Sequence, residues 1–388
     1  MKKQLTTRYS IHQMAYWMAA AGVISFASAF LLQKGFAAAQ VGILLSSGNL
    51  LSFALQPLLA ARADRIGGNI LKQLTAALTA LCMLCFLALL FLPLPQWLFG
   101  LVYLLGIFTL DSMVPLLNSI CVSYNAQGYY INYGLGRGVG SLAYSVAALG
   151  IGRVIADFGG DWMLWIVVAL LAVLALTTLS FPNVDAAARS AGETAQECCS
   201  LGEFFRRYKL YCVSLLGVML LATFHAMTEN YFIRIFGRLG GDSSSVGVAL
   251  FIATLAEFPI FLFFDRIRAR IPNALLLKIA GFSFLLKAVL LFFAPSVGAI
   301  YLIQLLQASS YGFLSPTQLY YASDRVSPAD MVKGQAFITA SYTLGCALGN
   351  FLGGQLLEFF DVPALLLAGI GVAALGTVIL CLTVGKKR

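Results

Sequence analysis

The segment Gln56-Pro57-Leu58-Leu59 leads into Asp64-Arg65-Ile66-Gly67, and the chain contains a second version of this pattern. The second version is Glu257-Phe258-Pro259 followed by Asp265-Arg266-Ile267, so that the two aspartates are 201 positions apart. Each version comes at the end of an apolar segment. Repetition over such a distance predicts a chain made of two similar halves, each with its signature at the same place.

The composition excludes a protein whose whole surface faces water. The chain has 388 residues, of which 60% are hydrophobic and 11% are charged, and its mean hydropathy is +0.87. Soluble domains carry about 25% charged residues. Twelve apolar segments are long enough to cross a hydrocarbon core of about 30 Å as helices. The first six lie near 11–32, 40–61, 71–92, 97–121, 132–155 and 162–182, and the second six near 209–234, 245–264, 273–294, 297–322, 333–358 and 362–384.

The spans and the repeat together predict an all-α integral membrane protein with two six-helix bundles. We place the bundles at 1–182 and 209–388, with a cytoplasmic linker at 183–208 that contains the one long polar segment. Such paired bundles are typical of secondary transporters, which bind a solute near the middle of the membrane and expose it to each side in turn. No small-residue cleavage site follows the first span, so we expect this span to stay in the mature protein.

Lysine and arginine are distributed unevenly over the segments that join the spans, and this predicts the orientation of the chain. Of the 25 cations, 19 lie in the termini and loops of one side and 4 in those of the other, while Arg137 and Lys287 lie inside spans. Both termini are therefore expected in the cytoplasm, with the protein in the cell membrane. The net charge of +9 follows from this topology, so no nucleic-acid partner is expected.

The sequence does not offer the side chains that a membrane-embedded enzyme would need. Its two histidines, His12 and His225, belong to different spans, which argues against a paired metal site or a Ser–His–Asp arrangement. Cys82 and Cys85 form a Cys-x-x-Cys pair without a nearby histidine or acid. We therefore expect no metal, no cofactor and no enzymatic activity. A sensor is also disfavoured, because it would need a long soluble signalling domain.

The sequence resembles the major facilitator superfamily over essentially its whole length. More narrowly, it is similar to the branch with lactose permease, the nucleoside–proton symporters and the phenylpropionate permeases. The segment from Gln56 to Gly67 is similar to the superfamily's signature between spans two and three. Tyr133-Gly134-Leu135-Gly136-Arg137-Gly138-Val139-Gly140 resembles the segment in which lactose permease has an aromatic–glycine pair and an essential arginine. Tyr144 stands where that permease has its sugar-stacking tryptophan.

The resemblance also implies a conformational switch. In the superfamily, charges of the signature hold neighbouring helix ends on the cytoplasmic side and stabilise the outward-open state. The corresponding residues here are Asp64, Arg65 and Gly67, with Asp265 and Arg266 in the second version.

Several departures from lactose permease change the expected substrate. Asn118 stands where that permease has its sugar-binding glutamate, three residues after a proline of span four. Gln304, Gln307 and Ser310 stand where it has the lysine, histidine and glutamate of span ten. Galactoside recognition is therefore not expected, and proton coupling would need other groups. Glu257 on span eight is similar to the phenylpropionate branch.

Ionisable residues inside the spans are the main functional candidates. A charge at the bilayer centre costs at least about 2.5 kcal/mol on insertion scales, so such residues usually face a cavity or a partner. The six are Asp111, Arg137, His225, Glu229, Glu257 and Lys287. Alternative interpretations remain open. Arg137 could extend to the cytoplasmic surface, Glu229 could be a rim acid paired with Arg234, and His225 and the amides could be hydrogen-bonded links between helices.

These observations predict a carrier that moves one small organic solute by alternating access, with proton symport for uptake. Glu257, Glu229 or Asp111 would carry the proton, Lys287 or Arg137 would compete with it for the carboxylate, and His225 belongs to the same group. The predicted substrate-binding residues are Asn49, Asn118, Arg137, Tyr144, Gln304 and Gln307. An aromatic or carboxylated compound, a nucleoside or a sugar-like solute would fit. A drug-type exporter is the alternative. We expect a monomer, because Gly345, Gly349 and Gly353 are interpreted as helix-packing residues rather than a dimer interface.

Overall fold

The computed structural model describes residues 2–66, 68–126, 128–183, 200–327 and 330–385, and in these ranges it is helical without strands. The chain divides into two compact units. Unit 1 comprises residues 1–190 and 242–251, and unit 2 comprises 191–241 and 252–388. The predicted linker lies mostly outside the described residues. The predicted division at 183–208 remains a prediction, and each unit is described by itself below.

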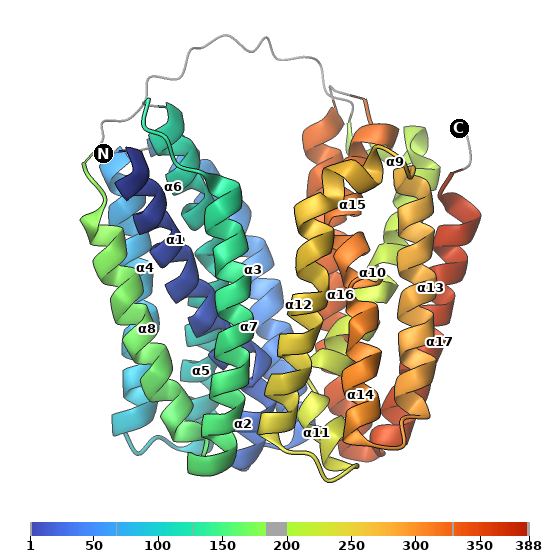
Figure 1. Ribbon diagram of the computed structural model, residues 1–388, viewed down its shortest axis with the longest axis horizontal. Helices are drawn as coiled ribbons and strands as arrows, with labels where there is room; N and C mark the ends of the chain where they lie inside the picture. Colours follow the sequence, from blue (N-terminus) through green and yellow to red (C-terminus); the bar gives the residue numbers. More distant parts are fainter. Residues whose placement is uncertain (1, 67, 127, 184–199, 328–329, 386–388) are drawn as a thin grey trace. The chain divides into compact units, whose positions relative to one another are not determined.

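Unit 1 contains the helices from the N-terminus through α8, drawn from blue to green in Figure 1. They are α1 (Lys2–Ala20), the π-helical turn η1 (Ala21–Ser25), α2 (Ala27–Gln33), α3 (Ala38–Ile66), α4 (Gly68–Phe91), α5 (Gln96–Ser112), α6 (Val114–Ala126), α7 (Tyr133–Phe158) and α8 (Gly160–Ser180). Helix α1 packs against α7 and α8, and α4 packs against α5 and α8.

Unit 2 contains the remaining helices, apart from the first residues of α12. They are α9 (Leu201–Arg207), α10 (Lys209–Glu229), α11 (Phe232–Gly237), α12 (Ser243–Arg268), α13 (Asn273–Phe292), α14 (Val297–Ile303), the 3₁₀ turn η2 (Gln304–Gln307), α15 (Tyr311–Arg325), α16 (Met331–Phe359) and α17 (Val362–Thr383). Helix α10 packs against α16 and α17.

The helical membrane fold predicted from the sequence is confirmed. Ten helical stretches of the described chain are long and apolar enough to cross a membrane, and the count is eleven if α1–η1 and α2, which meet at 49°, form one bent span. The twelfth expected span, 333–358, corresponds to α16. This helix is long enough at 29 residues, but it is not among these ten or eleven stretches.

Four expected spans are interrupted, and they are the first and fourth of each half. Span one changes to a π-helical turn at η1, and span four breaks at Met113 between α5 and α6. Span seven breaks between α10 and α11, and span ten passes through η2. Such interruptions free backbone carbonyls, which must find partners inside a membrane. Side chains supply them in unit 1, where Tyr103 Oη donates to Val23 O (2.9 Å) and Tyr16 Oη to Leu110 O (3.2 Å).

The glycines of α16 let this helix approach α10 closely. A Cβ atom at Gly345 would collide with the carbonyl oxygen of Met219, and one at Gly349 with that of Thr223. At Gly353 it would lie 2.7 Å from the Tyr231 ring. The two GxxxG steps are thus occupied by helix packing within unit 2, as small residues allow in lipid.

We therefore expect Gly349→Ala to lower the free energy of unfolding by about 1–3 kcal/mol, because the added methyl overpacks a backbone contact. Gly371→Ala on α17 is the matched control, since nothing lies within 4 Å of its Cβ position. Alanine should be neutral or stabilising there through its higher helix propensity. Thermal unfolding of the purified variants in detergent measures both effects, and equal midpoints for Gly349→Ala and the unmodified protein would contradict the packing argument.

Candidate functional site

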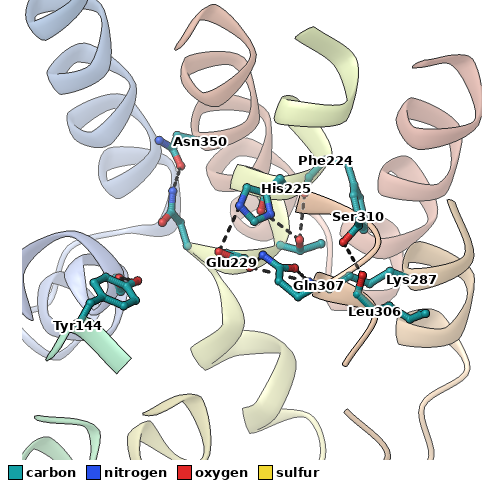
Figure 2. Close-up of polar contacts among 12 residues, drawn as sticks. Tyr144, Phe224, His225, Glu229, Lys287, Leu306, Gln307, Ser310 and Asn350 are labelled. Atoms are coloured by element: carbon teal, nitrogen blue, oxygen red, sulfur yellow. Dashed lines mark hydrogen bonds and ion pairs between the residues drawn. The ribbon is translucent and has the colours of Figure 1, made fainter. Parts of the chain in front are cut away.

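Four polar side chains of unit 2 form a connected network, shown in Figure 2. Lys287 Nζ on α13 donates to Gln307 Oε1 at 2.5 Å, and Gln307 Nε2 donates to Glu229 Oε1 at 3.1 Å. The Lys287 ammonium lies 3.8 Å from the same carboxylate oxygen, and His225 Nε2 lies 3.4 Å from Glu229 Oε2. The amide of Gln307 therefore bridges a cation and an anion, with its oxygen toward the ammonium and its nitrogen toward the carboxylate.

Because this network is buried, the charge of Lys287 must be compensated by its neighbours. The Lys287 side chain is 0% exposed and that of Glu229 is 20% exposed. An isolated ammonium in such a place would cost several kcal/mol of desolvation, and only well-placed opposite charge and hydrogen bonds offset this. Glu257, which is also buried, lies within electrostatic reach of Lys287. The buried cation thus has one acid, Glu229, at 3.8 Å and a second, Glu257, within electrostatic reach.

Aromatic rings enclose the histidine end of the network. The His225 ring stacks on Tyr311 with centroids 4.8 Å apart and an interplanar angle of 18°, and the edge of Phe284 meets it at 5.9 Å. Its Nδ1 atom has no hydrogen-bond partner among the described residues. The stack fixes the plane of the imidazole, and so directs Nε2 toward Glu229.

Helix ends and interruptions bring these residues together. Glu229 is the last residue of α10, where span seven breaks, and Gln307 ends η2, where span ten is interrupted. In a 3₁₀ helix, residues three apart lie directly above one another, so Gln304 and Gln307 are on the same side of η2. Gln304 is fully buried, and its amide has no hydrogen-bond partner in the described part of the chain.

Two of the predicted residues of unit 1, Arg137 and Tyr144, have polar partners within that unit. Arg137 Nη1 on α7 donates to Ser141 Oγ at 2.7 Å, and its guanidinium lies 4.0 Å from the centre of the Trp17 ring. Arg137 makes no ion pair with any acid of the described residues. Tyr144, one turn beyond Ser141, shares a hydrogen bond of 2.6 Å with Ser25 Oγ, which belongs to the π-helical turn η1.

The remaining predicted residues differ in whether they join these contacts. Glu229 pairs with Lys287 and His225, and the alternative pairing with Arg234 is not formed. Asp111, Asn118 and Asn49 are half-buried in unit 1 and join neither group. The Asp111 backbone oxygen accepts from Gln56 at 3.1 Å, so Gln56 links two helices. The sequence analysis did not identify Trp17 or Ser25. Trp17 could have been suggested only by its aromatic side chain and its position in the first span.

The switch residues are only partly described. The side chains of Asp64 and Arg65, and Gly67 as a whole, lie outside the described residues, so their predicted role stays a prediction. In the second version, Asp265 Oδ1 pairs with Arg268 Nε at 2.8 Å on its own helix, and the Arg266 guanidinium lies 5.3 Å from the centre of the Phe263 ring.

Because Lys287 is fully buried, Glu229→Gln should lower the free energy of unfolding by roughly 3 kcal/mol, the usual effect of removing one partner of a buried ion pair. The double variant Glu229→Gln, Lys287→Met should recover most of this loss, since it leaves no ammonium to compensate. Chemical unfolding in detergent of both single variants and the double variant completes the cycle. Additive effects would show that the two side chains are not energetically coupled.

Comparison with known proteins agrees with this architecture. The family described as MFS_1 like family matches residues 6–366. The chain is 25% identical to the uncharacterised transporter YwbF of Bacillus subtilis (strain 168) over 290 residues, which is 72% of this chain and 69% of that protein. Two solved structures show the same fold at lower identity. The nucleoside transporter NupG has a TM-score of 0.82 and 18% identity, over 100% of this chain and 100% of that one. The human organic anion transporter MFSD10 (TETRAN) has a TM-score of 0.65 and 15% identity, over 98% and 99%. This chain belongs to the MFS_1 like family of the major facilitator superfamily, and it is a membrane transporter and not an enzyme.

Proposed function

We propose that this protein takes up a small aromatic solute by proton symport, with Glu229 as the proton-carrying group. The observation that carries the proposal is the buried Lys287–Gln307–Glu229 network, because it couples the charge of one carboxylate to the pairing of one cation. Of the three acids that the sequence offers for this role, Glu229 is chosen because its carboxylate is in contact with Lys287, Gln307 and His225 together.

The coupling follows from electrostatics. When Glu229 is ionised, it neutralises Lys287 directly and holds Gln307. A proton on Glu229 removes this attraction, and the buried ammonium then depends on Glu257, which lies within its electrostatic reach. Loading and release of the proton would therefore shift the balance between two arrangements of α10, α12 and α13. An equilibrium between two such arrangements is what alternating access requires.

The proposed class of solute is inferred from side chains of unit 1. The Arg137 guanidinium carries five N–H donors, and Ser141 takes a hydrogen bond from it while Trp17 covers its face. Donors remain for an oxygen or ring nitrogen of a solute, and Tyr144 offers an aromatic surface nearby on the same helix. Both features suit an aromatic compound with hydrogen-bond acceptors. Nucleosides are the first class to test, because NupG is a nucleoside transporter, and aromatic carboxylates are the second.

A thermal-shift screen of nucleosides, aromatic carboxylates and sugars on the purified protein tests the solute class. Stabilisation by nucleosides or aromatic carboxylates, but not by sugars, is the expected result. Binding of many unrelated lipophilic compounds would instead indicate the drug-type exporter.

Glu229→Gln should abolish proton-driven accumulation in proteoliposomes while counterflow exchange continues, because exchange needs no net movement of protons. Glu203→Gln, an exposed acid of α9, is the control and should accumulate solute normally. Glu257→Gln is the discriminating variant: if it loses accumulation while Glu229→Gln retains it, the proton is carried by Glu257.

Arg137→Gln should weaken solute binding about 10- to 100-fold, the range expected for the loss of a hydrogen bond to a charged group. Arg153→Gln is the matched control on the same helix, since Arg153 is exposed and pairs with Asp157 at 2.7 Å. Calorimetric titration of the stabilising compound gives both affinities. Equal affinities in the two variants would remove Arg137 from the binding site.

A further inference from the structure

Three side chains of α1 form a ladder that ends at Arg137. Gln13 Nε2 donates to Tyr9 Oη at 2.7 Å, and Trp17 Nε1 donates to Gln13 Oε1 at 3.0 Å. Tyr9 and Gln13 are buried, at 0% and 1% exposure. The three residues are spaced four apart and therefore lie on one face of the helix. Both ends of the Gln13 amide are used, so the indole that stacks on Arg137 is held in a fixed plane.

The glycines of α7 make room for this ladder. A Cβ at Gly140 would lie 2.7 Å from Trp17 Cδ1, and one at Gly136 would lie 2.5 Å from Tyr9 Cδ1. Gly136 and Gly140 thus leave the space that the rings of Tyr9 and Trp17 occupy. The two helices together hold the guanidinium from two directions, with the indole on its face and Ser141 at its edge.

We propose that Trp17 is a positioning residue that sets the solute affinity of this transporter by holding the Arg137 guanidinium flat, so that its free N–H edge is presented to the solute. The proposal rests on the proposed solute-binding role of Arg137. A cation over a tryptophan face is worth more than one over phenylalanine or tyrosine, and a fixed donor loses less freedom when a solute binds. The ladder of α1 is therefore expected to set the affinity for the solute, while the Lys287–Gln307–Glu229 network of unit 2 is expected to couple transport to protons.

The test measures uptake of uridine and benzoate into proteoliposomes by variants of both helices. Trp17→Leu removes the ring and should raise KM about tenfold with the maximal rate within twofold, and Trp17→Phe should restore part of the affinity. Gly140→Ala displaces the indole and should resemble Trp17→Leu. The controls are Gly150→Ala, on the same helix with nothing within 4 Å of its Cβ position, and Trp162→Leu, where the ring is 55% exposed. Both should keep the KM of the unmodified protein.

An unchanged KM in Trp17→Leu and in Gly140→Ala would overturn the proposal, as would an equal rise in Gly150→Ala. A fall in maximal rate alone would also overturn it, because it would indicate a structural role.

A second measurement separates this proposal from the proposed function. The rate at which phenylglyoxal modifies Arg137, followed by peptide mass spectrometry, does not depend on which solute is transported. Removal of the ring that covers the guanidinium face should raise this rate several-fold in Trp17→Leu and leave it unchanged in Trp162→Leu. If neither probe compound is transported but the rate rises, the proposed solute class fails and the positioning role stands. Equal rates in both variants would overturn the positioning role itself.

Discussion

The buried ammonium of Lys287 is the constraint on which the polar interior of unit 2 depends. A charge that is fully removed from solvent must be compensated in place, and here the compensation comes from three different helices or turns. Gln307 accepts from it, Glu229 lies 3.8 Å away, and Glu257 is within electrostatic reach. No single helix could supply this set. The position of each partner therefore depends on the positions of the others. A change of charge on one carboxylate alters the electrostatic interactions of the whole set.

Interrupted helices make this arrangement possible. A continuous span presents its polar groups along one stripe, with the backbone groups already satisfied. The break after Glu229 and the 3₁₀ turn at Gln304–Gln307 release side chains and carbonyls from that pattern. Unit 1 has corresponding interruptions at η1 and Met113, where tyrosine hydroxyls donate hydrogen bonds to backbone carbonyl oxygens. The interruptions recur at the same places in both halves, and in unit 2 Glu229, Gln304 and Gln307 lie directly at them.

The two cations inside the spans have opposite surroundings. Lys287 is compensated by carboxylates, whereas Arg137 is held by an aromatic face and a hydroxyl without an acid among the described residues. Guanidinium is more weakly hydrated than ammonium and stacks on aromatic rings, so it tolerates such a site. This difference is the reason for assigning solute binding to one cation and proton coupling to the other.

The sequence by itself determined the class of the protein. The low charge, the length of the apolar segments and the repeated signature required a helical membrane protein of two similar halves, because few other chains combine these features. It also identified the rare charges inside the spans, since their insertion cost makes each one conspicuous. Only the tertiary structure decided which of them meet. Periodicity places residues on a face of one helix, but it does not say which helix lies opposite, so Glu229 could not be assigned to Lys287 in preference to Arg234. The role of Trp17 could not be assigned from the sequence either, because it arises from the close approach of α1 to the glycines of α7.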